Sequence, residues 1–170
     1  LPEFDPQLAV VARVERLLER CGYALTPAGR MILDNQYSRF CDHLRADAGF
    51  IAAYERFERV NVELKQVITD WQTLDVGGQR VRNDHSNPDH DAAVLDRLGG
   101  VHERFEPVLA QLSRALPRLA VYGKKLGAAL DQAEAGQTEW VSDAKLESYH
   151  TVWFELHEDL LRVLGRQREE

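Results

Sequence analysis

Apolar residues recur at helical spacing over most of the chain, and this pattern predicts an all-α fold. The clearest case lies between Asp47 and Trp71, where intervals of four and three residues alternate and place the apolar positions on one face of a helix. These positions are Ala53, Phe57, Val60, Leu64, Val67 and Trp71. The strict alternation typical of strands is nearly absent. We therefore predict one domain over residues 1–170, built as an antiparallel bundle of about six helices.

Capping signals divide the chain into the predicted helices. Thr26-Pro27 and Asn87-Pro88 each combine a side chain that can cap a helix with a proline suited to its first turn. Asp47 and either Ser142 or Asp143 are further predicted caps, and Gly22, Gly136 and Gly165 are predicted ends. The expected helices cover about 6–21, 26–46, 47–72, 88–116, 118–135 and 142–165.

One apolar pattern runs on from Leu95 to Leu130 and must be interrupted. A single helix over that span would be about 55 Å long, which is too long for a compact domain of this size. Pro117 is the favoured break, because a proline inside a helix costs about 3 kcal/mol. Pro107 is the alternative, and the pattern alone does not decide between them.

Composition and charge exclude several classes of function. The net charge is −7 at pH 7, which argues against a nucleic-acid contact in this segment, and no apolar run is long enough to span a membrane. Cys21 and Cys41 form no C-x-x-C pair and are expected to be reduced thiols of a cytoplasmic protein. Residues 1–5 resemble a cloning remnant, and residues 166–170 are expected to be a frayed tail.

The stretch CGYALTPAGRMIL, Cys21 to Leu33, resembles the wing-to-helix segment of winged-helix transcription regulators of the MarR and PadR type. The similarity covers about a dozen of the 170 residues, and neither a complete helix-turn-helix nor a wing hairpin precedes it. The resemblance implies that the chain is the C-terminal helical domain of such a regulator, the part that senses a ligand or dimerises. A DNA-binding segment would then precede it.

Residues 73–87 form the predicted polar connector between two helices. If Asn87 caps the following helix, Asp89 and Asp91 lie in its first turn. Acidic residues are favourable there, so the cap explains their presence. It does not explain Asn83, Asp84 and His85, which precede the cap. Connections in helical bundles usually have 2–8 residues, so this one is long. The sequence is compatible with two interpretations of this connector, a ligand site and a plain loop.

The C-terminal helix is predicted to place two histidines and a tryptophan on its apolar stripe. His150, Trp153 and His157 share this face, and each histidine is either part of a pocket or a residue at the edge of the core. Our hypothesis brings the connector to this stripe, with a small planar or aromatic ligand against the tryptophans. The predicted ligand-binding residues are Trp71, Asn83, Asp84, His85, His150, Trp153 and His157.

Metal and catalytic motifs are weak in this sequence. Glu147 and His150 have the E-x-x-H spacing of di-metal bundles, but such sites need two of these motifs. His150 and His157 lie about 10.5 Å apart along a helix axis, too far for joint ligation. No phosphate-binding loop, nucleophile elbow or H-E-x-x-H motif occurs, and no cofactor or catalytic residue is indicated.

The leading functional prediction is a non-catalytic ligand-sensing or interaction domain, with a homodimer left open. The alternative is a small helical enzyme, metal-assisted, that uses His85, His150 and His157. The weak metal-ligand candidates are Glu147, His150, His157 and His85.

Overall fold

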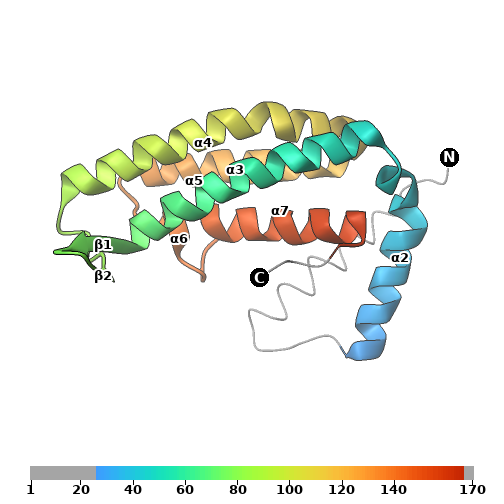
Figure 1. Ribbon diagram of the computed structural model, residues 1–170, viewed down its shortest axis with the longest axis horizontal. Helices are drawn as coiled ribbons and strands as arrows, with labels where there is room; N and C mark the ends of the chain where they lie inside the picture. The colour runs from blue at the N-terminus through green and yellow to red at the C-terminus, as the bar shows by residue number, and fades with distance from the viewer. Residues whose placement is uncertain (1–25, 167–170) are drawn as a thin grey trace. The chain divides into compact units, whose positions relative to one another are not determined.

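The computed structural model describes residues 26–166, and most of them are helical (Figure 1). The helices are α2 (Pro27–Arg45), α3 (Ala48–Gln72), α4 (Pro88–Ala115), α5 (Ala120–Glu134), α6 (Glu139–Ser142) and α7 (Tyr149–Leu164). A 3₁₀ turn, η1 (Pro117–Leu119), joins α4 to α5, and the strands β1 (Thr73–Val76) and β2 (Gln79–Arg82) form a small hairpin. The prediction of a helical bundle is confirmed. The predicted helix at 6–21 lies outside the described residues.

The chain divides into two compact units, which are described separately. One contains residues 53–153, and the other combines residues up to 52 with those from 154 onward. A single domain over residues 1–170 stays a prediction. None of the described helices combines the length and the apolar character that a membrane-spanning segment requires.

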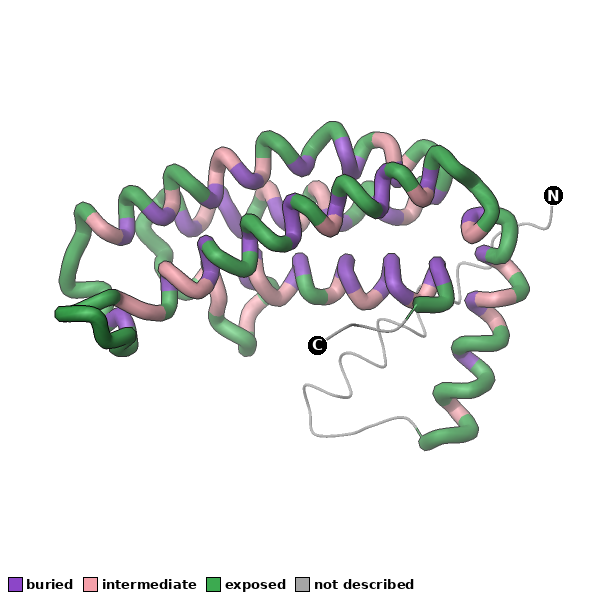
Figure 2. Tube along the Cα trace, viewed as in Figure 1, coloured by how far each residue is buried: buried purple, intermediate pink, exposed green. Residues whose placement is uncertain are grey.

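The unit of residues 53–153 is built on α3, α4 and α5, and each of these helices runs antiparallel to the one before it (Figure 1). Buried residues recur along one face of each helix, as Figure 2 shows. Every position of the predicted α3 stripe is buried, from Ala53 to Trp71. The hairpin follows α3 directly and returns the chain to the start of α4.

Three of the predicted helix starts are confirmed by their caps. The Thr26 hydroxyl accepts a hydrogen bond from the Gly29 amide at 3.1 Å. The Asp47 carboxylate accepts one from the Phe50 amide at 2.8 Å, and the Asn87 side-chain oxygen accepts one from the His90 amide at 3.2 Å. These bonds satisfy amide groups that have no partner within the first turn of a helix.

The break between α4 and α5 lies at Pro117, and Pro107 stays inside α4. Pro107 is exposed, and so is Glu103. Because proline has no backbone N–H, the Glu103 carbonyl lacks the hydrogen bond that residue 107 would otherwise donate to it in the helix. That carbonyl lies where water can bond to it. A proline on the solvent side of a helix is therefore tolerated here.

The predicted start of the C-terminal helix at Ser142 or Asp143 is wrong. The helix α7 begins at Tyr149, and the Ser148 hydroxyl accepts from the Thr151 amide at 3.3 Å. Asp143 instead accepts from the Lys145 amide at 2.7 Å and closes a local turn. Ser142 ends the short helix α6, which the sequence pattern did not predict.

In the other unit, polar contacts join α2 to the C-terminal part of α7. The buried Tyr37 hydroxyl donates to the Asp159 carboxylate at 3.0 Å. The Arg45 guanidinium donates to the carbonyl of Val163 at 3.0 Å, near the end of α7. Gly165 has a positive φ of 64°, which suits the predicted end of this helix.

Candidate functional site

Most of the predicted irregular connector is a β-hairpin, so that prediction is wrong for residues 73–82. The strands β1 and β2 pair antiparallel, with Val76 opposite Gln79. Gly77 and Gly78 between them have φ values of 64° and 84°, the left-handed backbone that a tight two-residue turn needs. A Gly-Gly pair between two short polar-apolar runs is the sequence signal for this turn. Only residues 83–87 remain as a loop before α4.

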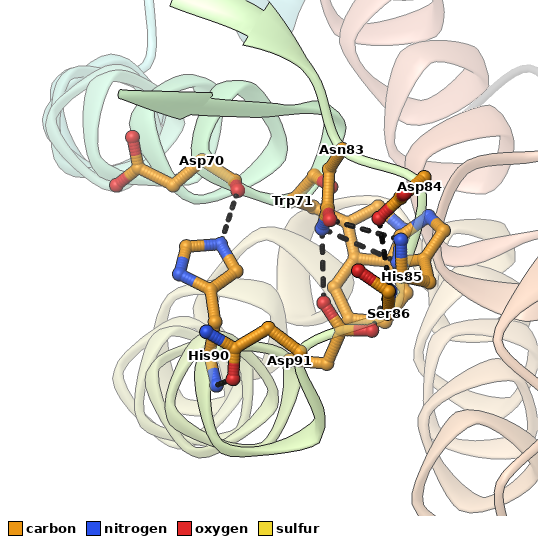
Figure 3. Close-up of polar contacts among 9 residues, drawn as sticks. Asp70, Trp71, Asn83, Asp84, His85, Ser86, His90 and Asp91 are labelled. Atoms are coloured by element: carbon orange, nitrogen blue, oxygen red, sulfur yellow. Dashed lines mark hydrogen bonds and ion pairs between the residues drawn. The ribbon is translucent and has the colours of Figure 1, made fainter. Parts of the chain in front are cut away.

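Asn83 is the centre of a buried polar network at the end of the hairpin (Figure 3). Its amide nitrogen Nδ2 donates to the Trp71 carbonyl and to Oδ1 of Asp91, both at 2.9 Å. Its oxygen Oδ1 accepts from the backbone amide of His85 at 3.0 Å. One side chain therefore links the end of α3, the loop and the first turn of α4.

Asp91 holds the His85 imidazole in one orientation. Its carboxylate oxygen Oδ2 lies 2.9 Å from Nδ1 of His85, and the Asp91 residue is buried. Both hydrogens of the Asn83 Nδ2 group are already used, and an ionised carboxylate only accepts. The hydrogen in the Nδ1–Oδ2 contact must therefore be on Nδ1. In the neutral ring, Nε2 is then an acceptor.

The backbone and the ring of His85 are both constrained. His85 has a φ of 60°, and it is the one residue other than glycine with a positive φ among residues 26–166. Its ring centroid lies 4.7 Å from that of Trp71, at an interplanar angle of 40°. Unusual backbone conformations of this kind are concentrated at functional sites. The fold thus fixes the position of this imidazole tightly.

Asp84 lies outside the network. Its carboxylate is exposed and accepts from the Ser86 amide at 3.0 Å. Hydrogen bonds from Ser86 hold the pKa of Asp84 below its ordinary value. The carboxylate that pairs with His85 is Asp91, whose place in the first turn of α4 indicates only a role at the helix start.

A second set of bonds fastens α4 to α3 beside the network. His90 donates through Nε2 to the Asp70 carbonyl at 2.9 Å, as Figure 3 shows. The Asp70 carboxylate accepts from Arg97 at 2.7 Å and from Gln66 at 2.7 Å. Burial raises the pKa of Asp70, but the hydrogen bonds from Arg97 and Gln66 outweigh it. The pKa of Asp70 therefore lies below its usual range.

This lowered pKa predicts a pH dependence of stability that Asp70→Asn removes. A carboxyl with a lower pKa in the folded state stabilises it above the unfolded pKa of about 3.9, and this contribution is lost as pH falls through the folded pKa. The pair is partly exposed, so we expect about 0.5 kcal/mol at pH 7. Urea unfolding of both proteins between pH 7 and pH 2.5 measures it. A constant difference across that range would contradict the prediction.

A groove of about 670 Å³ lies beside the network. One wall comes from the end of α3, the hairpin and the loop, and includes Arg80, Arg82 and His85. The other wall comes from α6 and its flanks, with Glu139 and Asp143. Trp71 borders the groove but is only 2% exposed, because His85 covers it. Most of the residues that line this groove have polar or charged side chains.

Trp153 lies in the core and away from Trp71. Its ring packs on Phe57 and Phe105, with centroids 5.1 and 4.5 Å apart. Its Nε1 donates to the Asn61 side chain at 3.0 Å. Asn61 precedes Trp71 by ten residues on α3, which is about 15 Å along the axis. The two tryptophans do not form one ligand wall.

The network at the end of the hairpin contains one of the predicted histidines, His85. His150 is half-buried on the first turn of α7, and the bonds of His85 go to Asn83 and Asp91 instead. His157 is buried and belongs to the unit that contains the C-terminal part of α7. Of the seven predicted ligand-binding residues, Trp71, Asn83 and His85 are in direct contact with one another.

Glu147 precedes α7, so Glu147 and His150 do not have the helical geometry of the E-x-x-H motif. The Glu147 carboxylate instead lies 2.5 Å from the Lys125 ammonium. Within residues 26–166, no three His, Cys, Asp or Glu side chains are grouped as a metal site would require. Metal ligation by Glu147, His150, His157 and His85 together therefore has no geometric support in this region.

Comparison with protein-family models, with curated proteins and with solved structures finds no match.

Proposed function

We propose that this protein is a ligand-sensing domain that binds a small polar ligand in the groove between the hairpin and α6. The observation that supports the proposal best is the fixed imidazole of His85. Nδ1 is bound to the buried Asp91, while the side chain is 35% exposed and lines the groove. In the part of the chain that the structure describes, no residue bonds to Nε2. This nitrogen can accept a hydrogen bond from a ligand.

The preorganisation of His85 distinguishes this groove from an ordinary surface depression. Asp91 bonds to Nδ1, Trp71 packs against the ring and Asn83 holds the backbone amide of His85, so little rotamer entropy is lost when a ligand binds. The volume is within the range of small-molecule sites. A polar ligand replaces the planar aromatic ligand of the initial hypothesis, because neither tryptophan presents an open face to the groove.

A role as the sensor domain of a winged-helix regulator, acting as a homodimer, is part of this proposal. Residues 21–25 of the resembling stretch lie outside the described residues. Thr26 and Pro27 form the helix start that the resemblance implies. A ligand that binds beside the α3–α4 connection would bias the relative position of these helices, which is the action a sensor needs.

The alternative is a small enzyme, and the Asp91–His85 pair is the observation that favours it. A carboxylate that fixes Nδ1–H and leaves Nε2 open is the arrangement of a general base. No nucleophile is positioned beside Nε2 by the described contacts. Turnover of a groove ligand, followed by product analysis, would support the enzyme over the sensor.

The proposal is tested by NMR titration of the full chain with a library of small polar fragments. We expect fragments that donate a hydrogen bond to shift the amide resonances of Asn83 and His85. His85→Ala should weaken this binding by about tenfold, the effect of losing one good hydrogen bond in a fixed site. His43→Ala is the matched control, because His43 is exposed on α2. Fragments that bind equally well to the His85 variant, or none that bind at the groove, would overturn the proposal.

A further inference from the structure

We infer that the ligand of this groove carries both a negative and a positive group, as a small zwitterion does. The inference rests on the proposed function and adds the chemical class of the ligand. It follows from the two walls of the groove, one of which presents arginines while the other presents carboxylates.

The strand β2 places its two arginines on the same wall. Thr73 pairs with Arg82 and Asp75 with Arg80, and residues two apart on a strand share a face. Thr73, Arg80 and Arg82 line the groove together with Val81. Asp75 lies opposite Arg80, but its carboxylate accepts from the Gly78 amide at 2.8 Å and forms no ion pair with Arg80. Within residues 26–166, neither arginine forms an ion pair.

The opposite wall supplies carboxylates. Glu139 and Ser142 are three residues apart on α6 and share a face of this helix, and Asp143 follows. All three line the groove together with Thr138. Asp143 uses Oδ1 for the Lys145 amide, which leaves its other oxygen for a cation. No ion pair joins Glu139 or Asp143 to the arginines across the groove among the described residues.

Two separated walls of opposite charge select for a ligand of mixed charge. A simple anion would be attracted by Arg80 and Arg82 but repelled by Glu139 and Asp143, and a simple cation would meet the reverse. A molecule with a carboxylate at one end and an ammonium at the other satisfies both walls. Its middle would lie beside His85, whose Nε2 can accept a further hydrogen bond.

Three matched probes test this inference by NMR titration of the full chain. They are 5-aminopentanoate, which carries both charges, pentanoate, which is only negative, and pentylammonium, which is only positive. We expect 5-aminopentanoate to bind at least about tenfold more tightly than either of the others, as one added ion pair in a site would give. Shifts should appear at Arg82, His85 and Glu139.

Two variants and two controls complete the test. Arg82→Gln and Glu139→Gln should each remove the advantage of 5-aminopentanoate, while Arg114→Gln and Glu103→Gln, both at exposed positions on α4, should keep it. Equal binding of all three probes, or binding of none, would overturn the mixed-charge ligand. The proposed function would survive that result if polar fragments still bind in a way that depends on His85, and it fails if no such fragment exists.

Discussion

Asn83→Ala is expected to lower the free energy of unfolding by about 2–4 kcal/mol, because it leaves several buried polar groups without partners. Asn83 is 3% exposed and bonds to the Trp71 carbonyl, the Asp91 carboxylate and the His85 amide. Chemical denaturation of the variant and the natural sequence measures the loss. Loss of the hairpin's NMR signals before global unfolding would show that the site opens first.

Asn35→Ala is the control for this substitution. Asn35 is exposed on α2, where alanine is at least as favourable as asparagine. That variant should therefore unfold within about 0.5 kcal/mol of the natural sequence. A similarly small change for Asn83→Ala would mean that the network does not hold the hairpin against α3 and α4.

Trp153→Ala is expected to cost about 3–5 kcal/mol, the usual cost of removing a large buried aromatic side chain. Trp153 is 2% exposed and packs between Phe57 and Phe105. Thermal and chemical unfolding measure the loss of stability. Titration of the remaining folded protein with a groove ligand should give an unchanged affinity, since Trp153 contacts Asn61 rather than the groove residues.

Trp153→Phe is a milder change that removes the indole N–H together with part of the ring. It keeps most of the ring but leaves the buried Asn61 oxygen without the indole N–H, so about 1–2 kcal/mol should be lost. A variant at Trp153 that keeps its stability and loses groove binding would instead support the ligand wall predicted from the sequence.

The helices could be predicted from the sequence because their signals are local. Thr26, Asp47 and Asn87 each cap a helix within three residues, and the apolar stripe of α3 repeats without interruption. The start of α7 could not be predicted with the same rule. Asp143 and Ser148 are both suitable caps, and the choice depends on a turn that the Asp143 side chain forms with Lys145.

The candidate site was predicted in part, for a related reason. Asn83 and His85 could be predicted as site residues because they precede the helix cap at Asn87, and the cap does not account for polar residues at those positions. Asp91 was overlooked because its place in the first turn of α4 gave it a sufficient local explanation. Apolar periodicity also shows which face of a helix is buried but not what it packs against. Periodicity therefore does not show that Trp153 packs on Phe57 and Phe105 in the core.

The Gly-Gly turn explains why residues 73–82 differ from the irregular connector predicted from the sequence. It folds residues 73–82 back on themselves, so the connector does not extend across the bundle. Its strands instead place Arg80 and Arg82 beside His85 along the groove. A hairpin shorter or longer by one residue would turn these arginines to the other face.

The protonation state of the His85 ring shows whether the fold holds this imidazole in one tautomer. In nitrogen-15 NMR of the imidazole at a pH where the ring is neutral, we expect the hydrogen on Nδ1 and a bare Nε2, with Asp91→Asn disturbing this pattern. The exposed His43 serves as the reference for an unrestrained ring. A His85 ring that carries its hydrogen on Nε2, or that matches His43 in its mixture of forms, would contradict the account of a fixed imidazole at the groove.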